Sequence, residues 1–349
     1  METDAVLVCP GEELVFLTGF SPMQCERFQG LFVKPDGSMF YVCNAIYTAE
    51  SGHAFGNECP VFTWHDNEGM PKIAEILKKQ GLWNKTIAVN STAQSFNIID
   101  LCAACGITAV NGKPLMEEIR IKKSHEELEN MRRAAQIADS CYDKVCAMAR
   151  PGITEAAIRD VILGTMEAQG GYGFDCIVAS GPNSSYPHYS SFDRVLQKGD
   201  AVVLDWGCHY KEVMSDTSRT IFIGSVSDTQ AAHYDLVDRA QLAGQAAAFE
   251  GAWIPDIDIA ARRVLDEMGL ASSLINRVGH GIGYSVHEGP YINQLNGRRL
   301  EKGMCFSVEP GVYFPGEYGI RIENIVCINE LGETEIFNKT DRSLRVVGK

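Results

Sequence analysis

The segment VVLDWGCHYKEVMSDTSRT, residues 202–220, most constrains the fold because it places two aspartates in strand-like surroundings. Asp205 closes one apolar run and Asp216 precedes another, although aspartate is depleted in strands. A hairpin turning near Tyr210 and Lys211 would set the two carboxyl groups opposite each other, with Cβ atoms roughly 5 Å apart. Two carboxylates at that separation repel, so a shared proton or a bound cation must relieve the repulsion.

A second pair of acids occurs in the same kind of segment later in the chain. Glu309 and Glu323 flank a turn at residues 315–317, which would again set them opposite each other. A histidine lies in the loop ahead of each hairpin, His188 in the first and His280 in the second. Glycines on both sides of His280 predict a backbone that can approach a substrate closely.

The order of elements repeats. Two helices, a histidine-bearing loop and a hairpin are predicted at about residues 124–223 and again at about 227–328. An internal duplication of this kind would bring the two hairpins together at a shared centre.

Capping-box patterns begin a helix in each half. They pair Ser124 with Glu127 and Ser227 with Gln230. The first helix is predicted to continue to the Pro-Gly pair at 151–152.

The first 115 or so residues predict a separate, small α/β domain, because short strand-like and helix-like runs alternate there. Strand-like runs are predicted at 5–8 and 14–17, followed by a hairpin around residues 34–37. We place the domain boundary between residues 116 and 117, which leaves 117–349 for the second domain. The predicted class of the whole chain is α+β.

Composition excludes several classes of protein. A chain of 349 residues can bury two cores, and its net charge of −14 argues against nucleic acid or an anionic membrane as the main partner. No apolar run approaches the roughly 20 residues of a membrane span. Twelve cysteines spread singly through apolar segments are typical of buried thiols in a reducing compartment, which predicts a cytoplasmic protein.

Four carboxylates and one imidazole form a hard ligand set that can hold two divalent ions, with two carboxylates bridging. Such a set suits manganese, cobalt or iron better than structural zinc, and manganese is the expected metal. A purely structural role is also open: Asp216 could cap a turn and Glu323 could pair with Arg321.

Five segments resemble the signature blocks of the metallopeptidases with the pita-bread fold, specifically the proline dipeptidase (prolidase) and aminopeptidase P branch. They are SGPNSSYPH, LDWGCHYKEVMSDTSRT, GHGIGYSVHEGP, VEPG and GIRIEN. The resemblance extends over essentially the whole chain and includes an N-terminal domain similar to that of creatinase and prolidase. It implies a duplicated helix-helix-hairpin catalytic domain after the smaller α/β domain.

The resemblance also implies a role for each candidate residue. The metal ligands would be Asp205, Asp216, His280, Glu309 and Glu323, with Asp216 and Glu323 bridging two ions. His188 and His287 match the imidazoles that contact the scissile peptide and its tetrahedral intermediate, and Arg321 matches the arginine beside the second bridging glutamate.

The implied activity is that of an exopeptidase that hydrolyses the Xaa-Pro bond of dipeptides or short peptides through a metal-activated hydroxide, with Glu309 passing the proton to the leaving nitrogen. Zinc remains a possible metal, and a homodimer is the implied assembly. Tyr291 follows Pro290 where several dipeptidases carry an arginine for the substrate carboxylate, which leaves an Xaa-Pro aminopeptidase open. A creatinase-like hydrolase and a non-catalytic binding module on the same scaffold also remain open.

Overall fold

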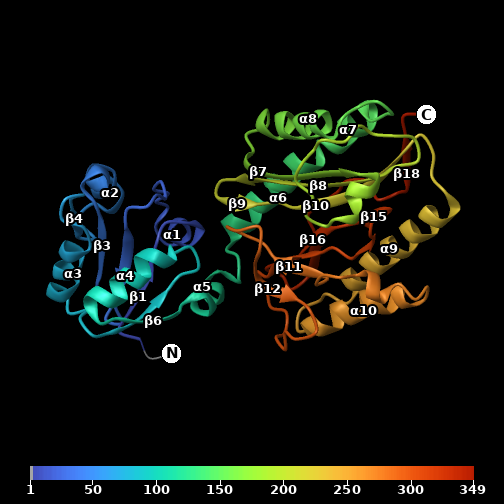
Figure 1. Cartoon of the computed structure of the whole chain (residues 1–349). Helices are drawn as coiled ribbons and strands as arrows, with labels where there is room; N and C mark the ends of the chain where they lie inside the picture. The colour runs from blue at the N-terminus through green and yellow to red at the C-terminus, as the bar shows by residue number, and fades with distance from the viewer. Residues whose placement is uncertain (1–2) are drawn as a thin grey trace. The chain divides into compact units, whose positions relative to one another are not determined.

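The computed structural model describes residues 3–349, which form two compact units (Figure 1). The first unit ends at Arg120 and the second runs from Ile121 to Lys349. The predicted division after residue 116 lies within helix α5 (Lys113–Arg120), the last helix of the first unit. No helix within residues 3–349 is both long enough and apolar enough to cross a membrane.

A six-stranded mixed sheet organises the first unit, with strand order β4-β3-β2-β1-β5-β6. Strands β2 and β3 form the predicted antiparallel hairpin, whereas β1, β5 and β6 are parallel. Apolar side chains of α3 and α4 pack on this sheet. The elements are β1 (Ala5–Val8), α1 (Glu12–Thr18), β2 (Gly30–Val33), β3 (Met39–Asn44), η1 (Ala45–Tyr47), α2 (Thr48–Phe55), β4 (Val61–Trp64), α3 (Gly69–Lys79), β5 (Thr86–Val89), α4 (Ser95–Cys105), β6 (Thr108–Asn111) and α5.

The strand predicted at residues 14–17 is wrong, because these residues lie in helix α1. An apolar run of four residues does not by itself distinguish a strand from a buried helix. The helix signals lie on either side of the run, since Glu12 and Glu13 occupy its first turn and Gly19 adopts the left-handed conformation at its end.

The second unit contains the duplicated arrangement. Its first half consists of α6 (His125–Asp139), α7 (Tyr142–Met148), α8 (Glu155–Glu167), β7 (Tyr172–Ser180), η2 (Gly181–Ser185), β8 (Ala201–Tyr210), β9 (Val213–Met214) and β10 (Thr217–Ile223). The second half consists of α9 (Asp228–Ala246), α10 (Ile254–Asp266), η3 (Ala271–Ser273), β11 (Gly279–Gly281), β12 (Glu288–Ile292), β13 (Cys305–Val308), β14 (Gly311–Phe314), β15 (Tyr318–Arg321), β16 (Asn324–Ile328), β17 (Thr334–Ile336) and β18 (Arg345–Val347).

Strands of the two halves form a central layer between two sets of helices. One sheet has the order β18-β10-β8-β7, with β9 pairing β8, a second has the order β12-β11-β13-β16-β17, and β14 pairs with β15. In Figure 1, α7 and α8 lie on one side of these strands, and α9 and α10 lie on the other. Each helix pair buries its apolar face on the adjoining strands, so the predicted α+β fold is confirmed.

Both predicted capping boxes are present, at Ser124 and at Ser227. The first helix does not continue to residue 150, because it ends at Asp139 and α7 begins at Tyr142. At the break, the Ser140 hydroxyl donates a hydrogen bond to the carbonyl of Ile137 at 2.7 Å. A serine side chain that bonds its own helix backbone competes with the next turn, which explains the interruption.

Candidate metal and peptidase site

Asp205 and Asp216 lie on neighbouring strands but not directly opposite each other. Strand β8 pairs with β10 so that Asp205 faces Ser218, and the same register continues into β9. Lys211 and Glu212 form the two-residue turn, with φ of 45° and 71°, and this turn fixes the register. The turn lies one residue later than predicted, so the predicted pairing of the two aspartates is wrong by two positions. They are diagonal neighbours on one face of the hairpin.

Glu309 and Glu323 occupy the predicted opposite positions. Strands β13 and β16 pair Val308 with Asn324, and β14 and β15 continue the same register beyond the two glutamates. The hairpin turns at residues 315–317, as predicted.

Hydrogen bonds join the two hairpins. The Ser218 hydroxyl donates to Glu323 Oε2 at 2.7 Å, and the Glu323 amide donates to the Ser218 carbonyl at 3.1 Å. The Thr220 hydroxyl donates to the Arg321 carbonyl at 3.0 Å, and the buried Arg219 donates to the Glu323 carbonyl at 2.6 Å. The predicted meeting of the two hairpins at a shared centre is confirmed.

His280 places its imidazole among the carboxylates. Its Nε2 lies 3.2 Å from Glu309 Oε1 and 3.8 Å from Asp216 Oδ2. Ligand atoms of Asp216, His280 and Glu323, all buried, lie within 4.8 Å of one another, as a metal ion would require.

The glycines beside His280 allow close packing of the backbone, while the predicted approach of a substrate stays a prediction. A Cβ on Gly279 would lie 1.9 Å from the Ser307 carbonyl oxygen, and one on Gly281 would lie 2.1 Å from the Gly289 carbonyl oxygen. Only glycine allows β11 to lie this close to the neighbouring backbone.

Electrostatics favour a cation at this centre. Burial, and then the negative charge of Glu323, raise the pKa of Asp216 well above its usual range. Burial and Glu309 do the same to the pKa of Glu323, whose Oε1 is buried and has no hydrogen-bond partner within residues 3–349. Burial also opposes ionisation of Glu309, but its hydrogen bonds to His280 and Ser307, together with the charges of His280 and Arg321, outweigh that effect and lower its pKa. A divalent cation would screen the carboxylates and satisfy the orphaned oxygen, so the residues fit a metal.

Arg321 contacts Asp205 rather than Glu323, so the structural role that paired it with Glu323 is wrong. Its Nη2 donates to Asp205 Oδ2 at 2.5 Å, and its Nε donates to the Ser218 hydroxyl at 2.9 Å. The Tyr313 hydroxyl accepts a third bond at 2.8 Å. The guanidinium therefore connects the first aspartate to the serine that holds Glu323.

Two further histidines lie beside the carboxylates. The His287 ring lies 4.2 Å from the His280 ring between centroids, at an interplanar angle of 89°, and His188 lies 6.2 Å from His287 in a near-parallel orientation. Burial, followed by the neighbouring His280, lowers the pKa of His287 to about 4. Its imidazole is therefore neutral at pH 7 and has one N–H to donate.

These groups open onto one cavity of about 570 Å³ in the second unit. Seven of the eight predicted site residues line it, namely His188, Asp205, Asp216, His280, His287, Glu309 and Arg321. Glu323, the eighth, is buried beside Asp216 and His280. Sequence reasoning missed Asp175 and Asn276 in the lining, because the alternation of β7 places Asp175 on the face of Asp205 only once the pairing of Ile177 with Asp205 is known.

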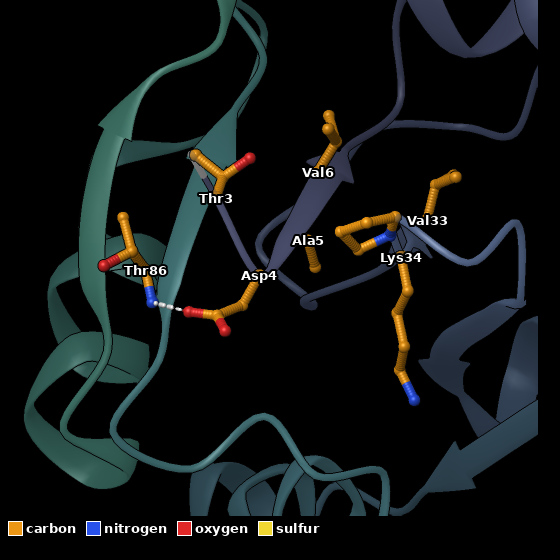
Figure 2. Close-up of a pocket in the computed structure, with 8 residues that line it drawn as sticks. Thr3, Asp4, Ala5, Val6, Val33, Lys34 and Thr86 are labelled. Atoms are coloured by element: carbon orange, nitrogen blue, oxygen red, sulfur yellow. Dashed lines mark hydrogen bonds between the residues drawn. The ribbon is translucent and has the colours of Figure 1, made fainter. Parts of the chain in front are cut away.

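A second cavity, of about 730 Å³, lies within the first unit and is shown in Figure 2. The Asp4 carboxylate there accepts the Thr86 amide at 2.9 Å and pairs with Lys85 at 2.9 Å. The lining lacks histidine and contains one acid: Thr3, Asp4, Ala5, Val6, Val33, Lys34, Pro35 and Thr86. It has neither the ligands nor the acid-base groups of the first cavity.

Proteins of known sequence are similar to this chain over most of its length. A probable dipeptidase PepE from Mycobacterium tuberculosis is 33% identical over 337 residues, covering 95% of this chain and 89% of that protein. An Xaa-Pro dipeptidase from Lactobacillus helveticus is 32% identical over 340 residues, covering 95% and 92%. A crystal structure of a prolidase from Thermococcus sibiricus superposes with a TM-score of 0.91 at 28% identity, covering 99% of this chain and 95% of that one.

Family models agree with these relatives. Residues 2–122 match the creatinase/prolidase N-terminal domain, and residues 129–330 match metallopeptidase family M24. The second match contains every acid and histidine that lines the cavity of about 570 Å³. The resemblance drawn from the motifs is confirmed, and the chain belongs to metallopeptidase family M24 and is a peptidase.

Proposed function

We propose that this chain is a dinuclear-metal exopeptidase that hydrolyses the Xaa-Pro bond of dipeptides or short peptides. The observation that carries the proposal is the convergence of Asp205, Asp216, Glu309 and His280 at one cavity, with Glu323 and its orphaned oxygen buried beside them. The relatives named Xaa-Pro dipeptidase and prolidase support the choice of bond.

Asp216 and Glu323 would bridge two divalent cations, Asp205 would bind one of them, and His280 with Glu309 would bind the other. Oxygen-rich ligands with one imidazole suit Mn²⁺, and Co²⁺, Fe²⁺ or Zn²⁺ could take its place. Cations held there lower the pKa of water toward neutrality and polarise the scissile carbonyl.

Glu309 is the proton-transfer residue in this proposal. The Ser307 hydroxyl and His280 Nε2 both lie 3.2 Å from its Oε1, so the carboxylate is held in one orientation. Its lowered pKa keeps it ionised and able to accept a proton from the attacking water. The same group then gives this proton to the nitrogen of the leaving proline.

His287 and His188 act on the substrate peptide. Because the His287 imidazole is neutral and faces the cavity, its N–H can stabilise the oxyanion as the carbonyl becomes tetrahedral. His188, whose ring centroid lies 6.2 Å from that of His287, lines the same cavity and orients the peptide. Arg321 holds Asp205 and Ser218 in place.

A cation near the cavity favours dipeptides over longer peptides. Tyr291 stands where several dipeptidases carry an arginine, but the Arg277 guanidinium lies 4.8 Å from the Tyr291 ring centroid. Arg277 directly follows Ile275 and Asn276, which line the cavity. A free proline carboxylate could thus still meet a positive charge, which supports the dipeptidase over the Xaa-Pro aminopeptidase.

We also propose that the enzyme works in the cytoplasm as a homodimer. All twelve cysteines are free thiols, which suits a reducing compartment. The dimer rests on the resemblance to prolidases, and light scattering tests it.

Hydrolysis of Ala-Pro, Ala-Pro-Ala and Ala-Ala by Mn²⁺-loaded protein tests the proposed activity. We expect cleavage of Ala-Pro above both other peptides, and Glu309→Gln should abolish it while the melting temperature is retained. Faster cleavage of Ala-Pro-Ala would identify the aminopeptidase. Absence of cleavage of both proline peptides would refute the proposal. Metal analysis of protein kept away from chelators would test the creatinase-like alternative, which should hold no ion.

A further inference from the structure

The cavity contains one acid for which the proposed metal centre has no use. Asp175 lies on β7, where Ile177 pairs with Asp205 and Asp175 itself pairs with Gly207. Alternate residues of a strand share a face, so Asp175 lies on the same face as Asp205. It lines the same cavity as His188 and Arg321.

The other acids that line this cavity already have partners. Asp205 pairs with Arg321, Glu309 contacts His280, and Asp216 lies within the cluster that fits a metal. Asp175 forms no ion pair with any lysine, arginine or histidine within residues 3–349. Its carboxylate is therefore available to a cation that enters from the cavity.

The surroundings of Asp175 favour such a cation. Its side chain is exposed to solvent where it lines the cavity, and partial desolvation, followed by the charge of Asp205, raises its pKa. The Cys176 amide, His188 and Arg321 act in the opposite direction and do not compensate. A positive charge placed beside the carboxylate would relieve this penalty.

The proposed reaction supplies a cation at this place. When the first residue of a peptide is removed, the α-ammonium is bonded to the carbon next to the scissile carbonyl, so it must lie within the catalytic cavity. Carboxylates that hold divalent cations are already neutralised, which leaves Asp175 as the available acceptor for the ammonium.

We propose that Asp175 binds the α-ammonium of the substrate and thereby imposes the requirement for a free amino terminus. This role rests on the proposed exopeptidase function. It makes Asp175 a specificity residue that acts through substrate affinity rather than through the chemical step.

Ala-Pro and propionyl-proline differ only by the ammonium group, so comparing them provides the test. The proteins compared are the wild type, Asp175→Asn and the control Asp143→Asn at an exposed position, all loaded with Mn²⁺. Loss of a charge-assisted hydrogen bond should raise KM for Ala-Pro about 10- to 100-fold in the Asp175 variant and change kcat less than about threefold. The Ki of propionyl-proline as a competitive inhibitor should not change. Asp175→Glu should recover part of the affinity, and Asp143→Asn should behave as wild type.

Three results would overturn the assignment. KM for Ala-Pro could stay unchanged in Asp175→Asn, Ki for propionyl-proline could rise by the same factor as KM, or bound manganese could fall below the wild-type amount. The last result would make Asp175 a metal ligand. Failure of the wild-type enzyme to cleave Ala-Pro is a separate outcome, since it would refute the exopeptidase function itself.

Discussion

Two adjacent lysines allow a matched test of how burial controls the strength of an ion pair. Lys123 Nζ lies 2.5 Å from Glu288 Oε1, and both side chains are 1% exposed. Lys122 Nζ lies 2.5 Å from Glu301 Oε2, but these side chains are 52% and 48% exposed. The N–O distance is the same, so differences between the two pairs should come from solvation.

We expect Lys123→Met to lower the free energy of unfolding by about 3–5 kcal/mol, because it leaves a buried carboxylate without its cation. For a unit of this size, that loss corresponds to a fall in melting temperature of roughly 6–20 °C. Lys122→Met should cost less than about 1 kcal/mol. At temperatures where Lys123→Met is still folded, its activity should also be lower than that of the wild type, because Glu288 directly follows His287 in the chain.

Differential scanning calorimetry and urea titration measure these losses. The double variant Lys123→Met/Glu288→Gln removes both charges while the glutamine oxygen can still accept the Ser285 amide, which lies 3.2 Å from Glu288 Oε2 in the wild type. It should recover at least half of the lost stability. Burial would not control the strength of the ion pair if Lys123→Met lowered the free energy of unfolding no more than Lys122→Met, or if the double variant were less stable than the single one.

Chelation of divalent ions leaves Asp216 and Glu323 unscreened, so calorimetry should show a lower melting temperature that Mn²⁺ restores; an unchanged temperature would argue against the metal site. Arg321→Met removes the 2.5 Å partner of Asp205 and should lower kcat at least about tenfold, measured on Ala-Pro with metal content matched to wild type. The pKa of Glu335 is lowered, chiefly by its hydrogen bond to Arg132. This pair therefore stabilises the fold at pH values above the unfolded-state pKa of about 4.3. Its contribution disappears as pH falls through the lower, folded-state pKa. Glu335→Gln should therefore cost about 1 kcal/mol at pH 7 and nothing in strongly acidic buffer, as urea titrations at both pH values would show.

The two hairpins show which turns and strand pairings can be predicted from the sequence. The turn at residues 315–317 contains proline and glycine, so its position was predictable, and the opposition of Glu309 and Glu323 followed from it. The first hairpin turns at Lys211 and Glu212, which adopt positive φ although neither is glycine, asparagine or aspartate. Sequence gives no signal for such a turn, and one misplaced residue shifted the predicted pairing by two.

Side-chain environments were less predictable than element types. The acids that gather at the cavity could be picked out from the sequence because few arrangements place acids in apolar strands. The ion pair of Arg321 with Asp205 could not be read, since it joins residues separated by 116 positions. Asp175 was missed because a single acid in a strand has no distinctive pattern until the register of its neighbour is known.

The hydrogen bonds between the two hairpins also determine when the site can assemble during synthesis of the chain. Ser218 meets Glu323 across 105 positions, and the Asp216 carbonyl accepts a hydrogen bond from Asn338 across 122 positions. A ribosome releases the first hairpin long before the second, so two of the four acids wait without their counterparts while the remainder of the chain is translated. Capture of the proposed ions would therefore be a late, nearly post-translational event, and a chain terminated before residue 309 should be unable to retain them.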